Sequence, residues 1–164
     1  MATVASANLD RPTAERYVQL AQQAYSRFGN AEGQGEADLL RANMAKDLNA
    51  LDEARGFAQA GAERGRQTGS LWLEIRAQLV EAAIDVLAAK PEAASQKAEA
   101  AVARAREAGL ETLACQGLID LGMAYLSQVQ DERAEKVHRE ALAIAERNDA
   151  PFSAASARLG LAMD

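Results

Sequence analysis

The chain has 164 residues and a formal net charge of −6, and 49% of its residues are apolar but only 4% are aromatic. This length suits one compact domain or one short solenoid and argues against two independent domains. The acidic balance argues against nucleic acid as a partner, because a phosphate backbone calls for a basic surface or patch. The abundance of alanine favours helices that pack closely through small side chains.

Residues 1–10 lack both the basic start and the apolar run of a signal peptide. We expect them to form a flexible leader, followed by a single helical repeat domain over residues 11–164. No apolar run approaches the length of a membrane span, so we expect no membrane partner.

Beyond the leader, the sequence repeats with a period of forty residues. In rows that start at Ala31, Leu71, Glu111 and Pro151, four columns hold alanine or glycine in every copy, and a fifth is apolar throughout. The small columns are Ala37, Ala77, Gly117 and Ala157; Ala42, Ala82, Gly122 and Ala162; Ala14, Ala54, Ala94 and Ala134; and Ala21, Gly61, Ala101 and Ala141. The apolar column is Leu39, Leu79, Ile119 and Leu159.

Each row predicts two helices joined by short turns. Complete units are expected over about residues 31–70, 71–110 and 111–150, with a half unit at 11–30 that holds only a second helix and a half unit at 151–164 that holds only a first helix. Short joins between long helices make neighbours antiparallel. The predicted fold is therefore all-α, an α-α superhelix or solenoid of antiparallel helix pairs with about seven helices.

The third row shows the two helices most clearly. Apolar residues recur at helical spacing and predict a first helix over about Glu111–Gln128. A second helix is predicted over about Asp131–Arg147, with Asp131 as its N-cap. In the earlier rows, Gly69 and Gly109 are expected to end the second helices, as glycine does at helix C-termini.

Few residues offer chemistry. His138 is the only histidine, so neither a two-histidine zinc site nor a catalytic triad is expected, and we interpret it as a core or interface residue. Cys115 is the only cysteine and is expected to be an inert buried thiol in a reducing, cytoplasmic setting. Gly33-Gln34-Gly35 is expected to be a flexible join between helices, because no phosphate-loop lysine follows it. We therefore expect no catalytic residue, no metal, no cofactor and no enzymatic activity.

The third row also carries a family pattern. Leu118-x-x-Leu121-Gly122-x-x-Tyr125, followed by Ala134-x-x-x-His138, resembles the tetratricopeptide repeat. Leucine replaces the family's tryptophan and histidine its phenylalanine, and charged residues occupy the leucine slot in rows one and two. The forty-residue unit is similar to the longer-helix arrays of bacterial regulators and signalling ATPases. HEAT-type helix pairs, whose period is similar, are the structural alternative.

The resemblance implies a non-catalytic protein-interaction scaffold. In this family the first helices of the units line a concave groove that binds a peptide or a partner helix, and such a scaffold can serve as the sensor or adaptor part of a bacterial regulator. Carried over by register, the groove residues are Glu36, Leu39, Asn43, Lys46, Arg76, Leu79, Ala83, Val86, Gln116, Ile119, Met123 and Leu126. An apolar centre with a polar rim would suit an amphipathic helix or an apolar peptide. The competing interpretation is that these residues pack between units.

The two half units give the alternative function. Their helices lack a partner, and Phe152, Leu159, Leu161 and Met163 need cover. Either the chain is part of a longer array, or its end helices pack on another copy, as in a homodimer or a self-associating structural array.

Two further features have competing interpretations. Arg64, Arg66, Arg104 and Arg106 recur forty residues apart and could form an outer basic stripe for an acidic partner, or could simply complement helix C-termini. Trp72 could pack between units or anchor a ligand.

Overall fold

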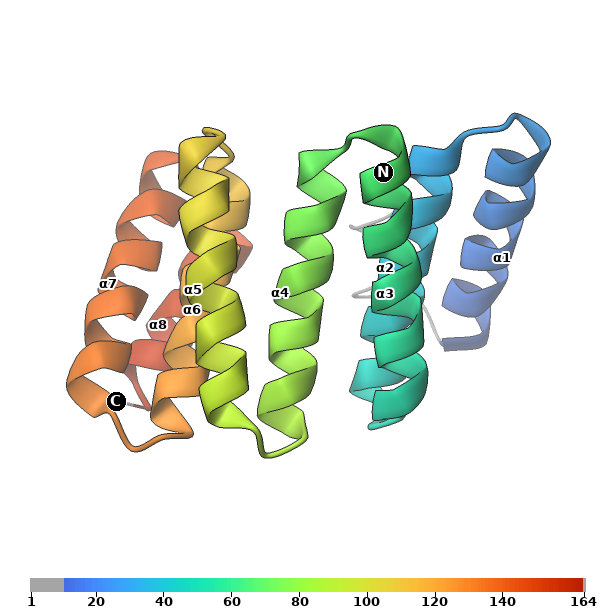
Figure 1. The fold of residues 1–164 in the computed structure, drawn as a ribbon. Coiled ribbons are helices and arrows are strands. Elements are labelled where there is room, and N and C mark those ends of the chain that lie inside the picture. Colours follow the sequence, from blue (N-terminus) through green and yellow to red (C-terminus); the bar gives the residue numbers. More distant parts are fainter. Residues whose placement is uncertain (1–10, 164) are drawn as a thin grey trace.

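The computed structural model describes residues 11–163, which form eight helices and no strand in that range (Figure 1). The all-α prediction is confirmed, with eight described helices where about seven were expected. The predicted leader, residues 1–10, lies outside the described residues. The helices are α1 (Arg11–Arg27), α2 (Ala31–Asp47), α3 (Leu51–Thr68), α4 (Leu71–Leu87), α5 (Pro91–Glu107), α6 (Glu111–Leu126), α7 (Asp131–Arg147) and α8 (Pro151–Leu161).

The forty-residue period is visible in where the helices begin. First helices start at Ala31, Leu71, Glu111 and Pro151, and second helices start at Arg11, Leu51, Pro91 and Asp131. Each helix packs against the next one in the sequence, so the chain is an array of neighbouring helix pairs that runs from α1 at one end to α8 at the other (Figure 1).

The helices form two rows with different spacing. Helices α2, α4, α6 and α8, here called the inner row, contact one another along the array. The backbones of α1, α3, α5 and α7, the outer row, contact only inner-row helices within the described part of the chain. Because the inner row is the more closely spaced, the array is concave on the inner side, and the two rows form the two layers of a solenoid.

Small residues hold the helix pairs together. Every residue of the four small columns in the three complete units is buried, whereas Ala14, Ala21 and Ala162 at the ends of the array are not. A Cβ atom on Gly61 would lie 2.6 Å from Cδ2 of Leu39. The ring of His138 lies against both Gly122 and Gly160, and a Cβ on either would overlap it. The glycines and alanines therefore set the distance between helices.

All the links between helices use the same backbone conformation. Gly29, Gly69 and Gly109 have φ near +65 to +69°, and Asp149 takes the corresponding place with φ +50°. The links within units have Asn49, Ala89 and Val129 at φ values between +55° and +59°. One left-handed residue between two helices is enough to reverse the chain. The predicted helix ends at Gly69 and Gly109 are confirmed.

Two local predictions were wrong. Gly33 and Gly35 do not form a flexible join, because they are buried inside α2, where Tyr25 and Leu73 occupy the space that a Cβ would need. Asp131 is the first residue of α7 rather than its N-cap, a position that Gln130 takes without a side-chain hydrogen bond. Helices α2 and α7 thus begin where the period places them, and packing outweighs the local signal.

Replacing Gly122 by alanine tests the spacing between α6 and α7. We expect Gly122→Ala to lower the free energy of unfolding by about 1–3 kcal/mol, because the new methyl overlaps His138. The matched control is Gly56→Ala in α3, where a Cβ meets nothing within 4 Å. It should stabilise the chain by about 0.5–1 kcal/mol through better helix propensity. Urea denaturation followed by circular dichroism measures both, and equal effects would contradict the packing described.

Candidate functional site

The candidate site is a cavity of about 240 Å³ on the concave side, formed by α2, α4 and α6. It brings together six of the twelve residues that the sequence predicted for the groove: Asn43, Lys46, Arg76, Leu79, Ala83 and Gln116. Because α2, α4 and α6 are successive first helices, equivalent positions of neighbouring units face this space in pairs, such as Asn43 with Ala83 and Arg76 with Gln116.

The other predicted residues lie on the same three helices with different exposure. Glu36 is exposed, and Val86, Met123 and Leu126 are half-buried. The apolar column is buried, with exposed fractions of 0% for Leu39, 3% for Leu79 and 7% for Ile119. These three side chains belong to clusters that join adjacent helices. That column therefore serves packing, and the accessible groove is more polar than expected.

Sequence reasoning missed three residues that line the cavity: Val80, Leu113 and Asp120. Asp120 and Val80 share a column with Leu40 and Gly160, so no residue type recurs there. The only signal available was position, because Asp120 lies four residues after Gln116 and so falls on the same face of the helix.

Burial perturbs the two central charges of the cavity. Burial raises the pKa of Asp120 to about 6, although a hydrogen bond from Gln116 and the charge of Lys46 oppose the change. Burial also lowers the pKa of Arg76, while the charge of Glu36 acts the other way. Half-buried charged groups with perturbed pKa values are typical of binding sites, because a ligand of complementary charge offsets the cost of their burial.

The polar side chains of the cavity are held by contacts along their own helices. Asn43 donates to the Leu39 carbonyl at 3.1 Å, and Lys46 donates to the Asn43 side chain at 3.1 Å. Gln116 donates to Asp120 at 3.1 Å. The Arg76 guanidinium lies 4.8 Å from the centre of the Trp72 ring, and this half-buried ring packs against two of the core clusters. The side chains are positioned without being linked across the groove.

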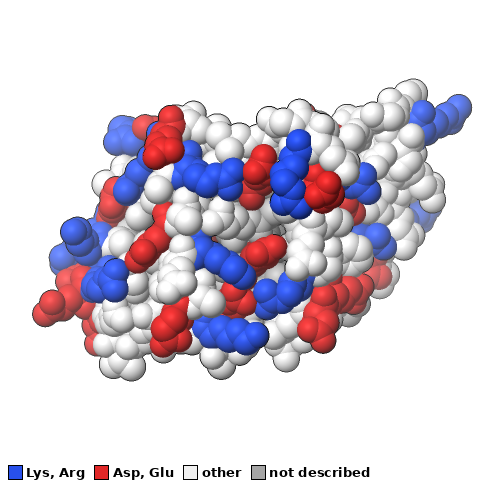
Figure 2. All heavy atoms as spheres, in the orientation of Figure 1, with Lys and Arg blue, Asp and Glu red and all other residues white. Residues whose placement is uncertain are grey.

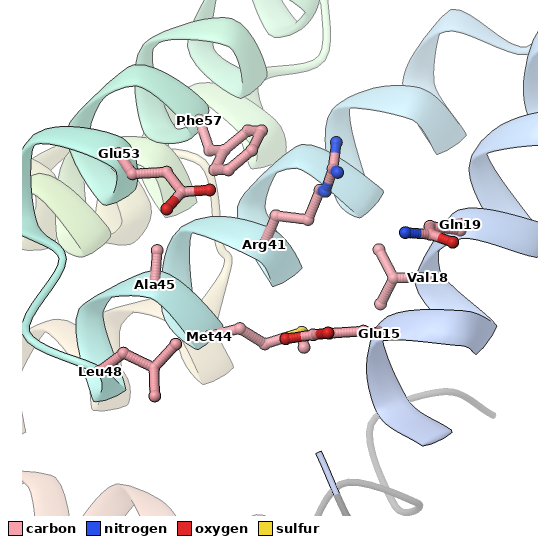
Figure 3. A pocket seen from close by; sticks show the side chains of 9 residues that line it. All are labelled: Glu15, Val18, Gln19, Arg41, Met44, Ala45, Leu48, Glu53 and Phe57. Carbon is pink, nitrogen blue, oxygen red and sulfur yellow. The ribbon is translucent and has the colours of Figure 1, made fainter. Parts of the chain in front are cut away.

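The outer row carries further hollows. One of about 240 Å³ lies among α1, α2 and α3, where Arg41 rises between Phe57 and Val18 (Figure 3). Two others, of about 320 and 330 Å³, lie between α5 and α7. The ion pair of Arg106 with Glu140 borders both of these. These hollows are gaps between spaced outer helices, whereas the inner cavity is lined by three successive first helices.

Contacts of the first helices with the outer row explain why Arg41 and Glu81 stand where the repeat pattern has leucine, as at Leu121. Arg41 stacks on Phe57, with 4.7 Å from its guanidinium carbon to the ring centre. Forty residues later, Glu81 pairs with Lys97 at 3.5 Å. In the third unit Leu121 and Val137 share an apolar cluster. The same pair of positions thus holds a cation–ring contact in unit one, an ion pair in unit two and an apolar contact in unit three. Units one and two therefore do not need the leucine.

The four arginines that could have formed a basic stripe do not form one. Arg64 reaches into its helix pair and donates to Asp38 and Gln34, both at 2.7 Å. Arg104 does the same forty residues later, with Glu74 and Gln78 at 2.9 and 3.1 Å. Arg66 and Arg106 pair with Glu63 and Glu140 on the surface. Figure 2 shows basic and acidic side chains interleaved across this face.

Asp85 is the centre of a buried ionic cluster between units. It accepts hydrogen bonds from Arg55 at 2.8 Å and from Lys97 at 2.5 Å. Burial alone would raise its pKa, but the hydrogen bonds and charges of Lys97 and Arg55 outweigh burial and lower the pKa below its ordinary value. The cluster therefore stabilises the fold above the pKa of the unfolded carboxyl, and this contribution disappears as the pH falls through the lower, folded pKa.

The residues considered for chemistry are packed into the core. His138 is fully buried between glycines of α6 and α8. The Cys115 thiol is buried and donates to the Ala141 carbonyl at 3.3 Å, and burial raises its pKa, which makes it a poor nucleophile. Within residues 11–163, no three His, Cys, Asp or Glu side chains are grouped so as to hold a metal ion.

The sequence matches no protein-family model, and no curated protein matches it either. The resemblance to the tetratricopeptide repeat therefore stays a prediction. Among the described helices, none is both long and apolar enough to cross a membrane.

Asp85→Asn tests the buried ionic cluster. We expect it to lower the free energy of unfolding at pH 7 by about 1–3 kcal/mol, because two cations lose their shared buried carboxylate. Glu81→Gln is the matched control, since it removes the more exposed carboxylate that contacts the same Lys97 at 3.5 Å. Its cost should stay below about 1 kcal/mol. Urea denaturation measures both variants, and an Asp85→Asn cost no larger than that of the control would argue against a structural role.

Proposed function

We propose that this chain is a non-catalytic, cytoplasmic interaction scaffold of the tetratricopeptide type, in which the inner-row groove binds a peptide or a partner helix. The observation that carries the proposal is the cavity of α2, α4 and α6, where half-buried charged side chains and two amide side chains from three successive units surround one space. Such a module would act as the sensor or adaptor part of a larger regulatory system.

The chemistry of the ligand follows from a gradient along the inner row. At two equivalent positions, α2 carries Asn43 and Lys46, α4 carries Ala83 and Val86, and α6 carries Met123 and Leu126. At these two positions the groove thus changes from polar to apolar along the array, while Gln116 and Asp120 keep the cavity side of α6 polar. The best-fitting ligand is an amphipathic segment whose apolar side chains lie over Met123 and Leu126 and whose polar groups face the cavity and α2.

The charged residues refine this description. Lys46 and Arg76 both line the cavity and would bind a carboxylate of the ligand by donating hydrogen bonds to it. Asp120 would accept a cation or a hydrogen-bond donor when ionised. A purely acidic tail fits poorly, because Glu36 and Asp120 lie on the same side as the two cations.

The groove is tested by selecting ligands from a displayed library of amphipathic peptides on the 164-residue chain and measuring the affinity of the selected peptides by fluorescence anisotropy. Arg76→Glu combined with Met123→Ala should weaken binding by tenfold or more, which corresponds to about 1.4 kcal/mol. The double variant removes one charged and one apolar contact from the proposed groove.

The matched control is Arg66→Glu, which makes the same charge change on the exposed outer face. It should leave the affinity unchanged. Peptides that bind the double variant as tightly as the original chain, or that lose affinity with the control, would show that the groove is not the binding surface.

Asp120 makes a separate prediction about pH. Because burial raises its pKa to about 6, its ionised form destabilises the folded chain above pH 6, and this penalty fades as the pH falls from 6 toward the ordinary carboxyl value. Asp120→Asn should therefore stabilise the chain at pH 7.5 and have a smaller effect at pH 4.5. Urea denaturation at the two pH values measures the difference, and an equal effect at both would contradict a raised pKa.

A further inference from the structure

The crossing of the two helices within a unit follows a fixed pairing of columns. Leu39 of α2 faces Gly61 of α3, and Leu79 of α4 shares a cluster with Ala101 of α5. Ile119 shares a cluster with Ala141 in the same way. A large apolar residue on the first helix thus meets a small residue on the second helix in all three complete units.

The two ends of the array each carry one member of this pairing, a large residue on α8 and a small residue on α1, and these two residues do not contact each other within one chain. Leu159 of α8 continues the apolar column, and it is 65% exposed while its three equivalents are 7% exposed or less. Ala21 of α1 continues the small column. A second pair of equivalent positions also lacks its contact at the ends of the array. Arg41 stacks on Phe57 in unit one, and the equivalent residues at the ends are Leu161 of α8 and Tyr17 of α1. Tyr17 is 59% exposed.

We propose that a second copy of this chain docks head to tail, so that α1 of one copy packs on α8 of the next as α3 packs on α2. Leu159 would then cover Ala21, and Leu161 would pack beside Tyr17. The two half units would together form one unit with a shorter first helix, since α8 has 11 residues and α2 and α4 have 17 each, and the columns would continue in register across the junction. This proposal is independent of the groove and of any ligand there.

The junction creates no buried charge without a partner. In unit one Arg64 of the second helix reaches Gln34 of the first, and in unit two Arg104 reaches Glu74. The corresponding residues at the junction are Ala24 and Ala154. An alanine pair needs no ionic partner, so the two surfaces can meet as they are. Arg158 continues the column of Asp38 and Leu118, which are 5% and 2% exposed, so the junction would cover it, and it can keep its pair with Glu146 at 2.8 Å.

A symmetric contact between two α8 helices fits less well. It would place large residues such as Leu159 and Phe152 against their own copies, whereas the crossings in this chain pair a large residue with a small one. Among the described helices, α1 alone has a small column with no preceding first helix packed on it. Because the two surfaces differ, the contact is heterologous, and each added copy exposes a new binding end.

The test measures the mass of the whole 164-residue chain in solution by light scattering over a range of concentrations. We expect the average mass to rise above 17.4 kDa as the concentration increases. Leu159→Glu and Ala21→Arg should each hold the chain at the monomer mass. Leu87→Glu is the matched control, because it changes an exposed leucine that lies on neither end helix, and it should leave the association unchanged.

Mixing the two variants tests the direction of the contact. The Leu159→Glu chain keeps an intact α1, and the Ala21→Arg chain keeps an intact α8, so an equal mixture should form a dimer of twice the chain mass and nothing larger. Circular dichroism checks that both variants keep the helix content of the original chain. A chain that stays monomeric at every concentration would overturn the proposal. So would an Ala21→Arg chain that still assembles alone, since that would indicate a symmetric contact through α8.

Discussion

The close approach of helices through alanine and glycine is the constraint on which the rest of this structure depends. Two helices can cross at short distance only where at least one of them lacks a large side chain. In this chain that condition is met every forty residues, at Gly61, Ala101 and Ala141 on one side of the crossing. Small residues also set the spacing of the inner row, because a Cβ on Gly35 would meet Leu73 of α4 and a Cβ on Gly117 would meet Leu79 of α4. The close spacing of the inner row produces the concave groove.

The fold could be predicted from the sequence because packing distance leaves a direct trace in residue size. A column that must be small is small in every copy, and such columns remain visible when other parts of a repeat have changed. The site could be predicted only in part. Residues such as Asn43 and Gln116 follow from register, but Asp120 does not, because the cavity constrains the position of its lining residues and not their type. The exposure of the groove residues also could not be predicted from register alone, since Leu39 and Asn43 are one helical turn apart but Leu39 is buried and Asn43 is half-buried.

Long charged side chains were the hardest to place from sequence. Arg64 and Arg66 are two residues apart, and one is half-buried in a helix crossing while the other lies on the surface. Their recurrence forty residues later suggested a common surface role, but the recurrence of Arg64 and Arg104 reflects a shared partner position on the first helix. Similarly, Gly33 and Gly35 have the composition of a loop, yet they serve as small residues inside a helix.

One pair of equivalent positions differs in every unit, and this difference affects how a repetitive chain folds. The pairs are Arg41 with Phe57, Glu81 with Lys97 and Leu121 with Val137. A repeat protein risks misalignment by one unit, because each second helix resembles the others in shape. If the second unit's helix were placed on the first unit's partner, Lys97 would face Arg41 where Phe57 normally stacks. Two cations would then meet in place of a cation and a ring. The differing pairs therefore favour packing of each second helix on the first helix of its own unit over packing that is shifted by one unit.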